Sequence, residues 1–207
     1  MITLEQLTGV MRSLKKRPVQ AAEYLPHLNA AMEKFGINTP KRIRAFLAQL
    51  AVESGELSRF RENMNYSAQR LRQVFGKYYP NQTIANLHAH RQELIANRVY
   101  GGRMGNVNPG DGWRFRGAGA IQATGRAMFA AVSRGLGYDF VSDPDALAEN
   151  LKYVFESAAW IFAVEKGLLD EADNDLFETI GIRINGGRNG MADRFKYWAL
   201  AKLAIRG

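Results

Sequence analysis

The sequence contains no cysteine, which excludes disulfide bonds, thiolate nucleophiles and cysteine metal sites. It also has no apolar run near the ~18 residues that a membrane-spanning helix needs. The first residues, MITLEQLTGVMRSLKKRP, place their charges after a weakly apolar segment, unlike a secretory leader. We therefore expect neither a membrane anchor nor a signal peptide, and a core held by packing alone.

Histidine is scarce as well. His88 and His90 are two residues apart on a predicted helix and so point to different sides, while His27 is remote in the sequence. We find no nucleophile-elbow motif and no Walker-type loop, so acyl and phosphoryl transfer lack the residues they need. The sequence predicts no metal site and no cofactor.

Helical periodicity dominates the chain. Leu4, Leu7, Met11 and Leu14 form one apolar stripe, and Leu25, Leu28, Met32 and Phe35 form another. Gly36 stands where a helix ends, and Thr39-Pro40 is typical of the start of the next. Further helices are predicted at 67–75, 84–97, 125–134, 144–166, 174–184 and 191–205, with glycine-rich loops at 101–119 and 185–190. The predicted fold class is mainly α.

The length of 207 residues suits one domain, or one core with two lobes. No repeat, linker or low-complexity tract marks a second module. We therefore expect residues 1–207 to form a single domain, without a separate binding module, that acts as a monomer.

The net charge of +8 makes a polyanionic partner plausible: nucleic acid, anionic lipid or cell wall. Nucleic acid has no support beyond the charge, because zinc-finger spacing, an RRM signature and a lysine-rich tail are all absent. The alternative is that the basic residues form a solvated surface without a specific partner.

Glu53 is the first candidate catalytic residue. Ile43, Phe46 and Leu50 recur at helical spacing on one face, and Glu53 is the next member of that series. Since Ser54-Gly55 should end the helix, Glu53 should lie where the core meets a cleft, partly withdrawn from water. This position favours the neutral carboxyl that a general acid needs. The alternative is a buried glutamate paired with an arginine.

Glycoside hydrolysis needs a second carboxylate, and Glu56 and Glu62 are the nearest candidates. Glu62 is better placed, because it lies in the polar segment RENMNYS, where Ser67 can cap the following helix. In that setting it can stay ionised and serve as a base. The alternative is a surface glutamate beside Arg61.

Five sequence motifs follow one another along the chain in this order: AVESGELSRFRENMNYSAQRL, VYGGRMGN, DGWRFRGAGAIQATGR, DPDALAEN and INGGRNGMADR. Together they resemble the ordered motifs of family 19 glycoside hydrolases, in the chitinase-related endolysin branch of phages and prophages, over residues 40–195. The resemblance implies a lysozyme-like, two-lobed domain with a substrate cleft. It also implies an enzyme of the host cytoplasm that reaches the periplasm and wall through a holin.

The resemblance also implies roles for single residues. Glu53 matches the general acid and Glu62 the general base, while Gln122 and Thr124 match positions that contact substrate and hold the attacking water. Asn185 matches a sugar-binding amide. For Gln122, Thr124 and Asn185 the alternative is that the side chain stabilises a turn or caps a helix. Tyr66 and Arg188 are further candidates for lining the cleft; a packed tyrosine and a solvated arginine are the alternatives.

Three positions depart from the family pattern. Val52 stands where histidine is common, Ala118 interrupts Gly117 and Gly119 where Gly-Arg-Gly is common, and Met128 replaces an asparagine. Both candidate catalytic residues, Glu53 and Glu62, are present despite these differences. The differences weaken the argument that chitin is the substrate. We therefore expect a peptidoglycan-degrading glycosidase. The alternatives are a chitinase and a non-catalytic basic protein that binds cell wall or nucleic acid.

The C-terminal segment 191–207 combines Phe195, Trp198, Leu200 and Leu203 with Arg194, Lys196, Lys202 and Arg206. This pattern predicts a cationic amphipathic helix, which suits contact with an anionic outer membrane. An ordinary terminal helix packed on the core is the alternative.

Overall fold

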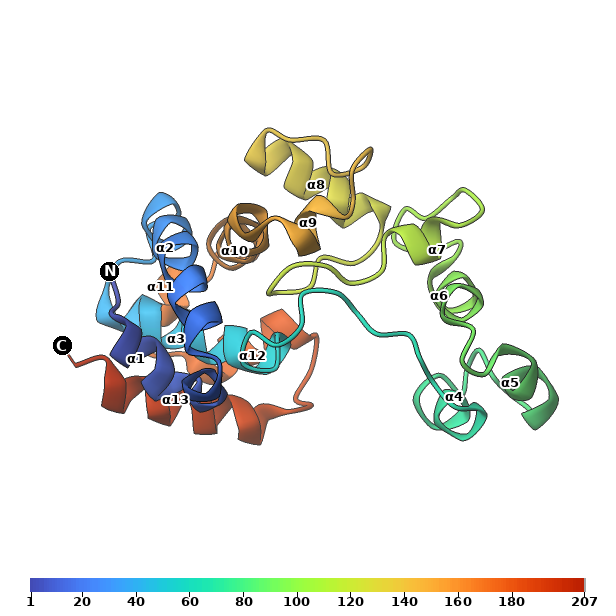
Figure 1. Cartoon of the computed structure of the whole chain (residues 1–207), viewed down its shortest axis with the longest axis horizontal. Coiled ribbons are helices and arrows are strands. Elements are labelled where there is room, and N and C mark those ends of the chain that lie inside the picture. Colours follow the sequence, from blue (N-terminus) through green and yellow to red (C-terminus); the bar gives the residue numbers. More distant parts are fainter. Residues whose placement is uncertain (207) are drawn as a thin grey trace. The chain divides into compact units, whose positions relative to one another are not determined.

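The computed structural model describes residues 1–206, and its regular secondary structure is almost entirely helical (Figure 1). The predicted mainly α class is confirmed. Within the described residues, β structure is limited to two isolated bridges, Arg61 with Ala118 and Ala118 with Ala123. The helices are α1 (Leu4–Val10), η1 (Arg12–Lys16), α2 (Pro18–Lys34), α3 (Pro40–Glu53), α4 (Ala68–Val74), α5 (Gln82–His88), α6 (Gln92–Tyr100), α7 (Asp111–Arg114), α8 (Arg126–Leu136), α9 (Ala146–Glu149), α10 (Leu151–Trp160), η2 (Ile161–Glu165), α11 (Leu169–Asp173), α12 (Phe177–Asn185) and α13 (Met191–Ala204).

The helix that carries Glu53 begins and ends as the sequence predicts. The Thr39 hydroxyl accepts a hydrogen bond from the Arg42 N–H at 3.3 Å, and Pro40 occupies the first turn of α3. Ile43, Phe46 and Leu50 are buried. Ser54 follows as the C-cap, so Glu53 is the last residue of the helix.

Two predicted helices, 84–97 and 144–166, are interrupted, and a third, 174–184, begins only at Phe177, so those predictions were wrong in extent. The predicted helix 84–97 is divided into α5 and α6, because His90 has a positive φ of 61°. Its N–H donates to the Tyr66 carbonyl at 2.9 Å, a tertiary contact that overrides local periodicity. Likewise, the Asn150 side chain caps α10 and separates it from α9, and Asp175, with φ of 57°, separates α11 from α12.

The chain divides into two compact units. Unit 1 comprises 1–60, 119–122 and 146–207, and unit 2 comprises 61–118 and 123–145. In unit 1, α13 packs against α3 and α1, and α10 packs against α2. Its core contains the aromatic cluster of Tyr24, Phe60 and Phe155, whose ring centroids are 5.5 to 5.9 Å apart.

Unit 2 has an apolar core of its own. Buried residues from α4 to α6 form one cluster: Met64, Leu71, Tyr79, Ala85, Ile95, Ala96 and Val99. Farther along the chain, the rings of Phe115 and Phe129 meet edge to face at 5.2 Å. This second core supports the segment 115–125, which carries part of the candidate site.

The C-terminal helix α13 is packed on the core of unit 1. Trp198 stacks on Phe177 at 4.7 Å, and Arg194 is only 2% exposed. The assignment of Arg194 to a solvated cationic face was therefore wrong, because that side chain points into the core. Lys196, Lys202 and Arg206 are exposed, and membrane contact through this helix stays a prediction. No helix within 1–206 is long and apolar enough to cross a membrane.

Candidate active site

The predicted site residues are distributed over both units. Glu53, Gln122, Asn185 and Arg188 belong to unit 1, whereas Glu62, Tyr66 and Thr124 belong to unit 2. Each unit thus carries one of the two predicted catalytic glutamates, and the surroundings of each glutamate are described separately below.

Glu53 faces a buried arginine. Arg194, from α13, donates hydrogen bonds to the Glu53 carboxylate and to the Gln49 side-chain carbonyl. The Arg194 side chain is 3% exposed and that of Glu53 is 22% exposed. Pairing with arginine was the alternative left open for Glu53. The partial exposure nevertheless leaves its carboxyl able to exchange a proton with a bound molecule.

The arginine suits a carboxyl that gives up a proton. When a carboxylic acid ionises beside a guanidinium, the cation stabilises the carboxylate that forms. Gln49 lies one helical turn before Glu53 on α3, is fully buried, and accepts a hydrogen bond from the same guanidinium. The three side chains therefore hold the Glu53 carboxyl in a defined orientation.

Glu62 is held by neutral donors. Its backbone N–H donates to the Gly117 carbonyl at 2.8 Å, and its side chain accepts the Gly117 N–H at 3.1 Å. The Tyr100 hydroxyl donates to the other carboxylate oxygen at 2.7 Å. Burial and the nearby Glu62 charge raise the pKa of Tyr100, so this tyrosine stays a donor across the neutral range. Arg61 pairs instead with Asp145 at 2.5 Å.

Thr124 lies in the same small region of unit 2 as Glu62. Ala118, next to Gly117, pairs with Ala123 through hydrogen bonds of 3.0 and 2.8 Å, and Thr124 follows Ala123 directly. Gly125 ends this turn with φ of 88°; a Cβ there would lie 2.5 Å from the Met104 Cβ, so only glycine fits. Thr124 is half-buried, which leaves its hydroxyl partly accessible.

The comparisons with known proteins establish the family of the chain. A glycosyl hydrolase family 19 domain-containing protein of Haemophilus influenzae is 39% identical over 173 residues, covering 83% of this chain and 84% of that protein. The chain belongs to glycosyl hydrolase family 19. It is therefore a glycoside hydrolase, as the ordered motifs predict.

Solved structures agree on the fold of this family 19 member. Chitinase C from Streptomyces griseus is similar with a TM-score of 0.59 at 13% identity, covering 87% of this chain and 83% of that chain. A mutant of chitinase C gives 0.58 at 14% identity, covering 88% of this chain and 68% of that chain. No protein-family model matches the sequence.

The other predicted substrate contacts have local partners in this family 19 enzyme. Asn185 donates hydrogen bonds to the carbonyls of Gly187 at 3.3 Å and Asn189 at 3.1 Å, so its side chain stabilises the loop that follows α12. Arg188 pairs with Glu178 on the surface, and Tyr66 packs edge to face on Phe75. Gln122 is half-buried. Contact of these side chains with sugar stays a prediction.

Glu56, the other candidate base, holds the fold together. Its carboxylate accepts the Ser13 N–H at 2.5 Å and the Tyr197 hydroxyl at 2.7 Å, and Arg17 donates to its backbone carbonyl at 2.8 Å. Burial by itself would raise the pKa of Glu56, but these hydrogen bonds outweigh burial and the pKa is lowered. The carboxylate thus links η1 to α13 within unit 1.

Sequence analysis missed two residues of the site, Arg194 and Tyr100. Both lie inside motifs that carry the family resemblance, INGGRNGMADR and VYGGRMGN. Arg194 was grouped with Lys196, Lys202 and Arg206 as the cationic part of an amphipathic helix, and Tyr100 was given no role. Their position within the motifs was the available indication.

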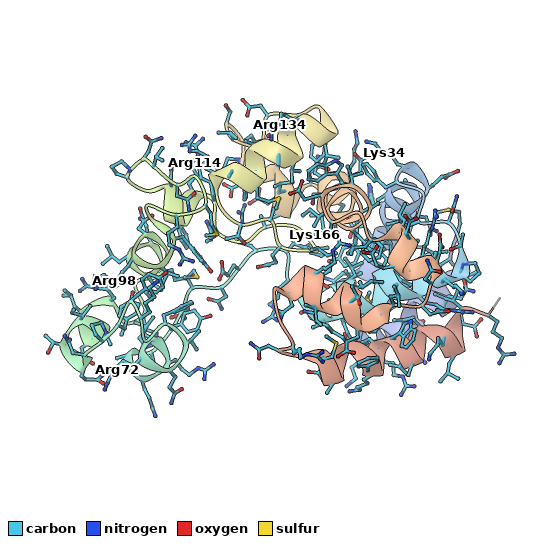
Figure 2. The ribbon with its side chains drawn as sticks, turned by 180° about the vertical axis from the view of Figure 1, so that it is seen from behind. Lys34, Arg72, Arg98, Arg114, Arg134 and Lys166 are labelled. Carbon is cyan, nitrogen blue, oxygen red and sulfur yellow. The ribbon has the colours of Figure 1, made fainter. Side chains whose placement is uncertain are left out.

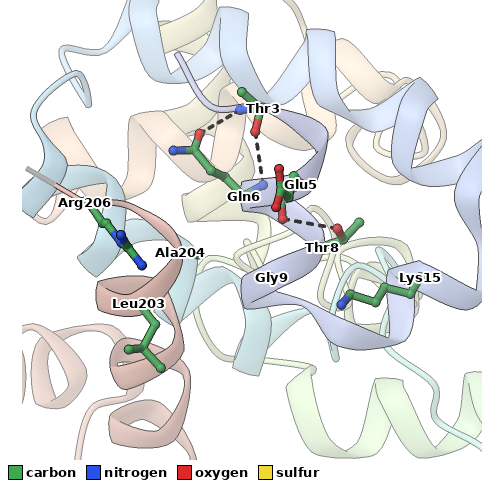
Figure 3. Close-up of a pocket in the computed structure, with 9 residues that line it drawn as sticks. All are labelled: Thr3, Glu5, Gln6, Thr8, Gly9, Lys15, Leu203, Ala204 and Arg206. Atoms are coloured by element: carbon green, nitrogen blue, oxygen red, sulfur yellow. Dashed lines mark hydrogen bonds between the residues drawn. The ribbon is translucent and has the colours of Figure 1, made fainter.

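A separate pocket of about 530 Å³ lies in unit 1 between α1 and the end of α13 (Figure 3). Thr3, Glu5 and Lys15 line it from the N-terminal side, and Leu203 and Arg206 from the C-terminal side. It contains none of the predicted site residues. Among residues 1–206 there is also no group of three or more acidic or histidine side chains arranged to hold a metal ion.

Proposed function

We propose that this family 19 enzyme hydrolyses the glycan strand of bacterial peptidoglycan, with Glu53 as general acid and Glu62 as general base. Glu53 protonates the glycosidic oxygen while Glu62 takes a proton from the water that attacks the anomeric carbon. The observation that carries this proposal is that both carboxyls are held in fixed orientations, by a guanidinium at Glu53 and by a hydroxyl and an amide N–H at Glu62.

The partners of Glu62 fit the role of base. Two donors, the Tyr100 hydroxyl and the Gly117 N–H, fix the orientation of this carboxylate. An oxygen that also accepts a proton from water needs a free lone pair, and a carboxylate with two donors keeps such capacity. Thr124 then serves as the acceptor that orients the water, and the one-step reaction inverts the anomeric configuration.

Peptidoglycan is favoured over chitin by charge. The net charge of +8 suits a polyanionic wall, and Figure 2 shows basic side chains such as Arg72, Arg114 and Arg134 projecting from the ribbon. Chitin is uncharged and gains nothing from this surface. A chitinase that uses the same two glutamates is the second candidate, supported by the likeness to chitinase C.

The biological role that fits this chemistry is that of an endolysin. By the family resemblance, the enzyme is made in the cytoplasm of a bacterial host, is released through a holin, and degrades the wall to lyse the cell. The catalytic chemistry does not depend on this role, so the two are tested separately.

The test is digestion of purified peptidoglycan, followed by reduction of the products and mass spectrometry. We expect reduced muramic acid at the new ends. New N-acetylglucosamine ends would assign the other glycosidic bond, and turnover of colloidal chitin alone would favour the chitinase. The anomeric configuration of the first product should be inverted; a retained configuration would make Glu62 a nucleophile.

A further inference from the structure

A second cavity lies in unit 2, next to the segment that holds Glu62. Its volume is about 350 Å³, at the small end of the range for ligand pockets. Trp113, Arg114 and Arg116 line one side, and residues 142–145 line the other. We call it the Trp113 cavity. Arg116 immediately precedes Gly117, the backbone partner of Glu62, so the cavity adjoins one of the two proposed catalytic groups.

The far wall of the Trp113 cavity is tied down at both ends. Arg114 donates to the carbonyls of Val141 and Ser142, each at 2.9 Å. Arg61 donates to the Pro144 carbonyl at 3.2 Å and to the Asp145 carboxylate at 2.5 Å. Because fixed walls reduce the ordering cost of binding, this cavity is preformed for a ligand.

Arg116 brings a cation to the cavity that forms no ion pair within the described residues. Its guanidinium lies over the Trp113 ring at 3.5 Å and donates to the Trp113 carbonyl at 2.9 Å. Within residues 1–206 it makes no ion pair with a carboxylate, and its Nε atom is buried with no partner. Burial and the nearby Arg61 lower the pKa of Arg116, and together they outweigh the opposite effect of Asp145 and Glu62.

The opposite wall offers negative charge. The Asp143 carboxylate accepts the Tyr138 hydroxyl at 2.7 Å and remains exposed. The lining of the cavity therefore combines a cation, Arg116, and a carboxylate, Asp143, with the apolar surface of Trp113 and Pro144. This arrangement matches a short zwitterionic peptide better than a neutral sugar.

We propose that the Trp113 cavity binds the peptide stem of peptidoglycan, with a stem carboxylate on Arg116 and a free stem ammonium on Asp143. This inference rests on the proposed function and names the feature by which the enzyme prefers wall to chitin. Chitin carries no peptide, so it gains nothing from Arg116. A glycan strand whose stems have been removed keeps only the lactyl carboxylate of each muramic acid.

The experiment compares kcat/KM on two soluble substrates: glycan strands that carry stems, and the same strands after an amidase has removed them. We expect the wild type to favour the stem-bearing strands, and Arg116→Gln to lower that ratio by about tenfold, as for loss of a charged hydrogen bond. Arg116→Lys should keep part of the preference. Arg91→Gln, an exposed arginine of the same unit, is the matched control and should keep all of it.

The ratio separates recognition from catalysis. If Arg116 merely supports Glu62 or contacts the lactyl group, its loss lowers kcat/KM on both kinds of strand by the same factor. The ratio of the two kcat/KM values is then unchanged, and the proposal is overturned. An unchanged ratio with unchanged rates also overturns it. If the wild type cleaves neither strand, the proposed function itself fails.

Discussion

Arg194, on the last helix, forms an ion pair with Glu53, at the end of α3, and the arginine is almost fully buried. Residues 141 positions apart in the sequence thus meet inside unit 1. Because the same guanidinium also binds Gln49, the orientation of Glu53 depends on the packing of α13 against α3.

The first prediction concerns this arginine. Arg194→Lys keeps the charge, but a lysine lacks the planar fork that reaches Gln49 and Glu53 together. We expect kcat to fall by about tenfold or more, as for a charged hydrogen bond, while helix content is retained. Lys196→Gln, on the exposed side of α13, is the control. Wild-type turnover in Arg194→Lys would show that the ion pair does not position the acid.

A second prediction concerns the hydroxyl on Glu62. Tyr100→Phe keeps the ring but removes the donor at 2.7 Å, so Glu62 is held by Gly117 alone. We expect kcat to fall about tenfold, consistent with one hydrogen bond to a charged group. Tyr78→Phe in the same unit is the control. Since the pKa of Tyr100 is raised, wild-type activity should show no loss from tyrosine ionisation below about pH 10.

A third prediction separates Glu56 from catalysis. The folded state lowers its pKa from the ordinary 4.5, so Glu56 stabilises the fold above that pH and loses this effect as pH falls further. Glu56→Gln should therefore lower the free energy of unfolding by about 1–3 kcal/mol at pH 7, and by less near pH 3. Urea titrations at both pH values measure this. A pH-independent difference, or an equal effect in the exposed Glu33→Gln, would refute it.

The sequence was sufficient for the fold class and for the helix that carries Glu53, because apolar spacing, Thr39-Pro40 and Ser54-Gly55 are local features. It failed where distant residues decide the conformation. The break at His90 depends on the Tyr66 carbonyl, and Arg194 lies far along the chain from Glu53. The spacing of apolar residues carries no information on such contacts. The two glutamates could therefore be named as candidates from the sequence, whereas Arg194 and Tyr100 could not be identified as their partners.

A fourth prediction follows from the charge. If the net +8 recruits the enzyme to a polyanionic wall, activity on intact walls should fall steeply with salt. Activity on short soluble fragments should change little, because screening acts mainly on exposed charges beyond about 8–10 Å. Initial rates on both substrates at rising sodium chloride test this. Equal salt sensitivity on the two substrates would contradict it.

The most direct test of the account is the turnover of purified peptidoglycan by Glu53→Gln. An amide cannot protonate the leaving oxygen, so we expect kcat to fall by at least about 100-fold, the usual contribution of a general acid. The folded structure should survive, because glutamine can still accept the hydrogen bond from Arg194. Circular dichroism and thermal unfolding check this in the same preparation. Near-normal turnover in folded Glu53→Gln would contradict the assignment of Glu53 as the acid, and with it the proposed mechanism.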